Sequence, residues 1–276
     1  MRNREGHFRS RDGLDLYCQS WHPDAASKAV LAITHGHGEH SGRYQNIVGY
    51  FVPRGFTAYA YDLRGHGRSP GRRGNIRSWE DFRQDQGSFL EFVSQQEPGL
   101  PLFAYGHSLG GLIVLDFILR SPAGLRGAVV SAPVLGPPGI PPLLLTLSRV
   151  LSRMLPSLTM STGLDATGLS RDPAVVRAYR EDPLVHGKAN ARLGTELIET
   201  TEWVQSHAAD LRIPLLVVQG ELDRITRPSD TRRFVEHLTF SDTQHIEYVG
   251  GFHEPHNDIE HERVMADVEA WLTRHL

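Results

Sequence analysis

The chain has 276 residues, of which 39% are hydrophobic and 22% charged, as expected for a soluble globular protein with one sizeable core. Its 29 Lys and Arg residues nearly balance its 32 Asp and Glu residues, and a net charge of −3 argues against nucleic acid as a partner. Cys18 is the single cysteine, which excludes an intrachain disulfide and a cysteine metal cage. The chain starts without the apolar stretch of a signal peptide and has no apolar run near the roughly 18 residues of a membrane span, so we expect a cytoplasmic protein.

Short apolar runs alternate with longer amphipathic stretches, which predicts an α/β fold with a mostly parallel sheet and helical crossovers. Two alternating segments around residues 7–9 and 14–21, joined by a turn at Asp12, predict an antiparallel hairpin at the sheet edge. Ser78 is the expected N-cap of a helix that runs to about Gln96. The expected central strands, apolar enough for burial on both faces, are residues 29–34, 57–61, 102–105, 127–131 and 214–219.

The alternation stops at a segment rich in proline and glycine after residue 135 and resumes near Leu211. We therefore expect a core of residues 1–134 and 211–276 with an inserted helical cap of residues 135–210. Apolar side chains of residues 143–158 fall on one arc of a helical wheel, which could line a substrate channel, pack on the core or make a transient contact with a lipid surface. The residues expected to bind an acyl chain are Ile140, Leu143, Leu147, Leu151 and Met154.

Residues 106–111, Gly-His-Ser-Leu-Gly-Gly, match the G-x-S-x-G pattern of a nucleophile elbow, and they stand between an apolar strand and an apolar stretch, as that turn requires. A serine on such a strained turn needs glycines on both sides, because side chains there would collide with the neighbouring strand and helix. Ser108 is therefore the candidate nucleophile.

A serine hydroxyl needs a base to take its proton and a carboxylate to orient that base, and in this type of fold the acid and then the histidine follow the serine along the chain. Asp223 follows the expected strand 214–219 and is the candidate acid, with Glu221 as the alternative. His253 follows an expected strand at 244–249 and two glycines and is the candidate base, with His256 as the alternative.

An acyl-transfer site also needs two backbone N–H donors for the developing oxyanion. One donor is expected to be the amide of Leu109, directly after the nucleophile. The second is assigned to the amide of His37, in the glycine-containing loop after the strand 29–34. The His35 side chain is expected to brace this loop.

Five segments in this order resemble the α/β-hydrolase superfamily, and within it the monoacylglycerol lipase and lysophospholipase-like branch. The resemblance covers nearly the whole chain, and Tyr179-Arg180-Glu181-Asp182-Pro183-Leu184 also resembles the cap of that branch. The five segments are residues 35–44 (HGHGEHSGRY), 61–69 (YDLRGHGRS), 106–111 (GHSLGG), 220–224 (GELDR) and 251–253 (GFH).

The resemblance implies an eight-stranded sheet, a Ser108–His253–Asp223 triad, no cofactor and hydrolysis of a small-molecule, single-chain acyl ester such as a monoglyceride. It also implies that Glu39, Arg43, Tyr179 and His256 line the polar end of the site, where a glycerol-like group is held. The sequence departs from the branch at position 37, usually a small residue, and at position 109, usually Met, although both residues are expected to act through backbone amides.

Other functions stay open at this point. Lysophospholipase, general esterase and amidase activities use the same catalytic groups. His35, His37, Glu39 and His40 lie close to the spacing of a dinuclear zinc hydrolase, although the expected site holds no metal. A non-catalytic ligand receptor on the same fold is the remaining alternative.

Overall fold

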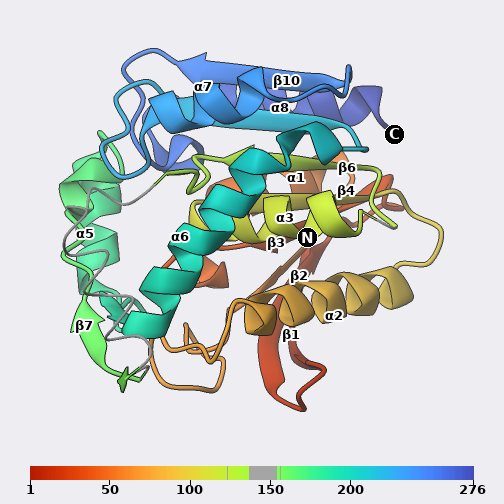
Figure 1. Ribbon diagram of the computed structural model, residues 1–276. Coiled ribbons are helices and arrows are strands. Elements are labelled where there is room, and N and C mark those ends of the chain that lie inside the picture. The colour runs from red at the N-terminus through yellow and green to blue at the C-terminus, as the bar shows by residue number, and fades with distance from the viewer. Residues whose placement is uncertain (123, 137–153, 156) are drawn as a thin grey trace.

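A computed structural model describes residues 1–122, 124–136, 154–155 and 157–276. Its centre is one eight-stranded sheet in the order β1-β2-β4-β3-β5-β6-β9-β10 (Figure 1). In this sheet β2 is antiparallel to both of its neighbours, β1 and β4, whereas β4, β3, β5, β6, β9 and β10 are parallel to one another. The expected hairpin and mostly parallel sheet are thus confirmed. The strands are β1 (Arg2–Arg9), β2 (Asp15–His22), β3 (Ala29–Thr34), β4 (Phe56–Tyr61), β5 (Leu102–His107), β6 (Gly127–Ser131), β9 (Leu215–Gly220) and β10 (Thr243–Tyr248).

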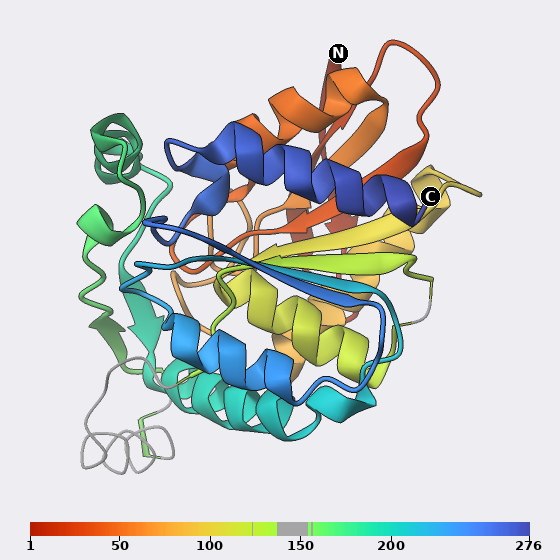
Figure 2. The same cartoon turned by 90° about the horizontal axis from the view of Figure 1, so that it is seen from above.

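Helices cover both faces of the sheet, so the central strands are buried on both sides (Figure 2). In β3, Leu31 and Ile33 pack towards one helical layer, whereas Val30 and Ala32 pack towards the other. The first layer contains α1 (Gln45–Phe51) and α8 (His261–Arg274), and the second contains α2 (Glu80–Gln96), α3 (Leu109–Arg120), α6 (Ala191–Ser206) and α7 (Pro228–Glu236). Short 3-10 turns are η1 (Ser41–Arg43), η2 (Val52–Arg54), η3 (Ala166–Gly168), η4 (Ala208–Asp210) and η5 (Pro255–Asn257).

The start of α2 differs from the expectation. The N-cap residue is Trp79, not Ser78, and its side chain makes no capping hydrogen bond. Instead, the backbone N–H of Trp79 donates to the carboxylate of Glu196 on α6, at 3.0 Å. A carboxylate from another helix therefore satisfies a free N–H at this helix end, which no local pattern around Ser78 could reveal.

The described part of the predicted cap holds more than helices. It contains α5 (Pro173–Glu181), α6 and a two-stranded antiparallel sheet of β7 (Thr159–Ser161) and β8 (Lys188–Asn190). Figure 1 shows α5 and β7 at one end of the central sheet. By contrast, α6 packs on the core, where Leu193 and Val204 are fully buried. The boundaries of the cap stay a prediction.

The expected acyl-binding residues Ile140, Leu143, Leu147 and Leu151 lie outside the described residues. Met154 is described, and 74% of it is exposed. Within the described ranges, no helix combines the length and apolar character needed to cross a membrane.

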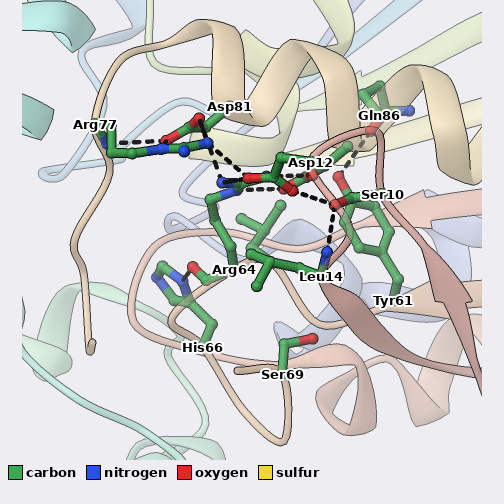
Figure 3. Close-up of polar contacts among 12 residues, drawn as sticks. Ser10, Asp12, Leu14, Tyr61, Arg64, His66, Ser69, Arg77, Asp81 and Gln86 are labelled. Carbon is green, nitrogen blue, oxygen red and sulfur yellow. Dashed lines mark hydrogen bonds and ion pairs between the residues drawn. The ribbon is translucent and has the colours of Figure 1, made fainter. Parts of the chain in front are cut away.

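The turn between β1 and β2, the loop after β4 and the start of α2 are joined by ion pairs around Arg64 (Figure 3). The guanidinium of Arg64 forms two hydrogen bonds of 2.6 Å with Asp85, which is fully buried, and lies 3.1 Å from Asp12 and 3.3 Å from Asp81. Arg77 pairs with the same Asp12 and Asp81 carboxylates. This arrangement, here called the Arg64 cluster, fixes the loop that follows β4 against two other segments.

Candidate active site

Ser108 stands on a sharp turn between β5 and α3, with φ 53° and ψ −115°. Its N–H donates to the Ser131 carbonyl at 2.9 Å, which ties the turn to the end of β6. A Cβ at Gly106 would lie 2.4 Å from the Gly110 carbonyl oxygen, and one at Gly110 would lie 2.1 Å from the Thr34 carbonyl oxygen. The predicted reason for the two glycines, collision with a neighbouring strand and helix, is confirmed.

Ser108, His253 and Asp223 are brought together from three separate connections at the carboxyl ends of β5, β10 and β9. The Oγ of Ser108 lies 3.0 Å from Nε2 of His253, and Nδ1 of His253 lies 2.8 Å from Oδ2 of Asp223. All three side chains are buried or nearly so. The distances allow His253 to accept the serine proton while its other ring nitrogen donates to the carboxylate.

Asp223 is held by four further donors. The backbone N–H groups of Ile225 and Thr226 donate to Oδ1, while the Thr226 hydroxyl and the Gln219 amide donate to Oδ2 at 2.7 and 2.8 Å. Gln219 and Thr226 are not among the site residues predicted from the sequence. The signal for Thr226 was present, because a turn of the form Asp-x-x-Thr lets the aspartate accept hydrogen bonds from residues two and three positions on.

The pKa of His253 is raised above its usual value of 6.5. Burial alone would lower this pKa, but the charge of Asp223 and its hydrogen bond outweigh burial. A raised pKa suits a base that must hold a proton during the reaction.

The two alternative triad members point elsewhere. The Glu221 carboxylate accepts the backbone N–H of Gly250 at 2.9 Å, on the exposed side of the loop. The ring of His256 stacks on Tyr44 and meets His107 edge-on, and burial lowers its pKa to about 4.

The loop after β3 lies directly against the nucleophile. A Cβ at Gly36 would sit 3.2 Å from the Cβ of Ser108. The His35 ring braces the loop as predicted, since its Nδ1 donates to the Gly36 carbonyl at 2.7 Å and its Nε2 accepts from the Leu63 N–H at 2.8 Å. Among the described residues, no acceptor engages the N–H of His37 or of Leu109. Both amides are therefore available to bind an oxyanion.

The His37 side chain faces the cap. Its ring meets His66 and His186 edge-on, at centroid distances of 5.3 and 5.6 Å. Burial, and after it the charges of His186 and His35, lower the pKa of His37 to about 3. The neighbouring Gly38 carbonyl accepts the N–H of His186 at 2.8 Å. Gly38 has φ 77°, and a Cβ there would lie 2.3 Å from the His186 carbonyl oxygen, so the cap and this loop meet backbone to backbone.

The residues expected at the polar end of the site lie close together but are partly engaged with each other. Glu39 and Arg43 form an ion pair of 2.6 Å, and the Arg43 guanidinium lies 4.8 Å from the ring centre of Tyr179 on α5. Arg43 also pairs with Glu254, a residue that the sequence analysis did not single out. A guanidinium has five N–H donors. Three of them are used by these two carboxylates, and the described residues engage neither of the others.

Two of the three histidines that resembled a zinc site, His35 and His40, use their ring nitrogens in other contacts. Both ring nitrogens of His35 are hydrogen bonded to backbone, and Nε2 of His40 contacts Asp182 of the cap at 2.8 Å. Across the described part of the chain, no group of three or more His, Cys, Asp or Glu side chains is arranged to hold a metal ion.

Comparison with known proteins also indicates a serine hydrolase. Residues 25–260 match the family model described as "Serine aminopeptidase, S33". The chain is 35% identical to the monoacylglycerol lipase of Mycolicibacterium smegmatis over 99% of this chain and 98% of that protein, and 28% identical to human monoglyceride lipase over 97% and 90%. It is also similar to the crystal structure of Paleococcus ferrophilus monoacylglycerol lipase, with a TM-score of 0.87 and 35% identity over 95% of this chain and 99% of that one.

The expected family is therefore confirmed on sequence and on structure. The family model spans residues 25–260, which include all five motifs and every strand of the central sheet except β1 and β2. The chain belongs to the S33 family of serine α/β hydrolases, on its monoacylglycerol lipase branch.

Proposed function

We propose that this serine ester hydrolase cleaves monoacylglycerols through an acyl-enzyme on Ser108. The observation that carries the proposal is the continuous hydrogen-bonded line from Ser108 Oγ through His253 to Asp223, at 3.0 and 2.8 Å. The choice of monoacylglycerol follows the names of relatives that match nearly the full chain.

In the first step, His253 takes the Ser108 proton as the serine oxygen attacks the ester carbonyl. The carbonyl carbon becomes tetrahedral, and its oxyanion accepts the N–H groups of His37 and Leu109. Asp223 holds the ring orientation and stabilises the imidazolium. His253 then gives its proton to the departing glycerol oxygen as the C–O bond breaks, and the acyl group stays on Ser108.

In the second step, water attacks the acyl-enzyme while His253 removes its proton. The same two amides hold the second oxyanion, and Ser108 leaves with the proton returned by His253, which releases the fatty acid. Neither reaction step requires a cofactor.

The two ends of the substrate are assigned to different parts of the protein. Glu39, Arg43, Tyr179 and His256 are proposed to surround the glycerol end; the free N–H donors of Arg43 support this. The acyl chain is assigned to Ile140, Leu143, Leu147, Leu151 and Met154, and each buried methylene would contribute about 0.8 kcal/mol. Lipid contact by the cap belongs to the same proposal, and the exposed Met154, Leu158 and Met160 favour it.

The test is hydrolysis of 1-monoacylglycerols and of p-nitrophenyl esters with two to sixteen carbons, with and without a serine-directed phosphonate and, separately, EDTA. We expect phosphonate mass on Ser108, loss of activity to the phosphonate alone and an optimum at medium or long chains. Ser108→Ala should fold normally and lose roughly 10³-fold or more of kcat. Near wild-type turnover by that variant, or loss to EDTA alone, would refute the proposal, and amide cleavage without ester cleavage would replace it by an amidase.

A further inference from the structure

A buried chain of charges runs beside the candidate triad. Arg43 stands between two carboxylates: its Nη1 lies 2.6 Å from Glu39 Oε2 and 2.7 Å from Glu254 Oε1, and its Nη2 lies 2.9 Å from Glu254 Oε2. The side chains of Arg43, Glu39 and Glu254 are only 9%, 3% and 1% exposed. The bidentate contact with Glu254 gives this pair a fixed geometry.

Each end of this chain holds a loop that carries a proposed catalytic group. At one end, Glu39 Oε1 accepts the N–H of Gly36 at 2.6 Å and the hydroxyl of Tyr44 at 2.9 Å, and Gly36 is next to the proposed oxyanion donor His37. At the other end, Glu254 directly follows His253 in the sequence. Its Oε2 also accepts the Asn257 amide at 2.9 Å, so the turn after His253 is held by the same carboxylate.

We propose that Glu254 is a positioning residue, which through Arg43 and Glu39 sets the oxyanion loop and the His253 loop at a fixed distance and adds negative charge beside His253. This inference rests on the proposed function, in which His253 is the base and His37 an oxyanion donor. Burying a second carboxylate next to Arg43 has a desolvation cost. The need to hold the two loops in a fixed geometry would explain why this carboxylate is present despite that cost.

Several buried charges surround His253 and affect its pKa. Both Glu254 and Glu39 raise the pKa of His253, after the larger effect of Asp223. Burial alone would raise the pKa of Glu254, but Arg43 lowers it to about 2, so Glu254 is ionised throughout the pH range in which His253 titrates. The charged and titratable groups around His253 are Asp223, Glu254, Glu39, Arg43, His107 and His256, with the Ser108 hydroxyl at Nε2.

The experiment compares Glu254→Gln and Glu254→Asp on p-nitrophenyl butyrate, which has no glycerol group and so does not report on head-group binding. We expect Glu254→Gln to lower kcat roughly 10- to 100-fold with little change in KM, because small displacements of catalytic groups have effects of this size. The acid limb of kcat/KM, which reports the pKa of His253 in the free enzyme, should move to lower pH. Glu254→Asp keeps the charge, so its acid limb should stay near the wild-type position even if kcat falls.

Glu260→Gln is the matched control. It removes one carboxylate from the same connection between β10 and α8, but the Glu260 carboxylate pairs with Arg171 and not with Arg43. Rates are normalised to the amount of enzyme that a serine-directed phosphonate labels, so a partly unfolded variant still reports on its folded fraction. The inference is overturned if Glu254→Gln keeps the wild-type kcat and acid limb, or if Gln and Asp move the acid limb equally. An inactive wild type or an active Ser108→Ala variant would instead refute the proposed function.

Discussion

Replacing Arg64 by methionine should strongly destabilise the fold, because it removes the cation from the Arg64 cluster and leaves Asp85 buried without its partner. Arg64 is 6% and Asp85 0% exposed in the side chain, and two hydrogen bonds of 2.6 Å join them. Removing one member of a buried ion pair costs about 3–5 kcal/mol of unfolding free energy. For a chain of this size that corresponds to a fall in Tm of roughly 6–20 °C.

The unfolding free energy that Arg64→Met loses relative to the wild type, here called the deficit, should also depend on pH. Burial raises the pKa of Asp85 from 3.8 to about 6, and Arg64 opposes this rise, so the pKa increases further when Arg64 is removed. As the pH falls, Asp85 of the folded variant therefore binds a proton well before the same side chain of the unfolded chain, which binds it only near pH 3.8. Because the folded state gains that proton first, the deficit should be about 1–2 kcal/mol smaller at pH 5.5 than at pH 8.

The assay is thermal unfolding of both forms at the two pH values, followed by circular dichroism. Arg68→Met is the control on the same loop, since Arg68 pairs with Glu5 and both side chains are about half exposed (51% and 52%). Such a surface pair contributes about 0–1 kcal/mol. Equal losses for the two variants, or a deficit at Arg64 that grows on acidification, would refute the reasoning. Arg64→Met/Asp85→Asn should recover part of the loss, because the uncompensated buried charge is gone.

Three further predictions concern the site. The acid limb of kcat/KM for the wild type should lie above pH 6.5, because the neutral form of His253 is active and Asp223 raises the His253 pKa against the effect of burial. An acid limb below pH 6.5 would contradict the role of His253 as the base. Thr226→Val should lower kcat/KM about 10-fold and cost roughly 1.5–3 kcal/mol of unfolding free energy, because the buried Asp223 carboxylate loses one hydrogen bond of 2.7 Å; steady-state kinetics and a melting curve will check both effects. Gly110→Ala should prevent folding or lower the unfolding free energy by more than about 3 kcal/mol, because the added Cβ would lie 2.1 Å from the Thr34 carbonyl oxygen. The control is Gly49→Ala in α1, whose Cβ would meet no atom within 4 Å; it should be neutral or stabilising in the same unfolding assay.

The sequence predicted the parts of the fold that depend on local pattern. The strands at Ala29–Thr34 and Gly127–Ser131 were predicted to the residue, because a parallel strand buried on both faces is a continuous apolar run. The start of α2 was not predicted, since its free N–H is satisfied by Glu196, more than a hundred residues away in the chain. The strand pair β7 and β8 was missed because three-residue strands carry too little pattern to be recognised.

The same distinction holds at the candidate site. Ser108, Asp223 and His253 could be chosen because each follows a strand and the order along the chain is fixed by the fold. Glu254 could not be chosen, because its importance depends on Arg43, which is 211 residues away in the sequence and meets it only in three dimensions. A charged residue whose role depends on a distant partner looks, in the sequence alone, like any surface carboxylate.

The backbone contact between Gly38 and His186 has a consequence for engineering substrate choice. A common way to change acyl preference is to graft a cap from one relative onto the core of another. In this protein the His186 N–H is bonded to the carbonyl of Gly38, one residue beyond the amide of His37. A grafted cap must therefore reproduce the backbone path at residue 186, and the recipient must keep glycine at position 38, where a Cβ has no room. A chimaera matched only at its two splice points would be expected to bind new chains yet turn them over slowly.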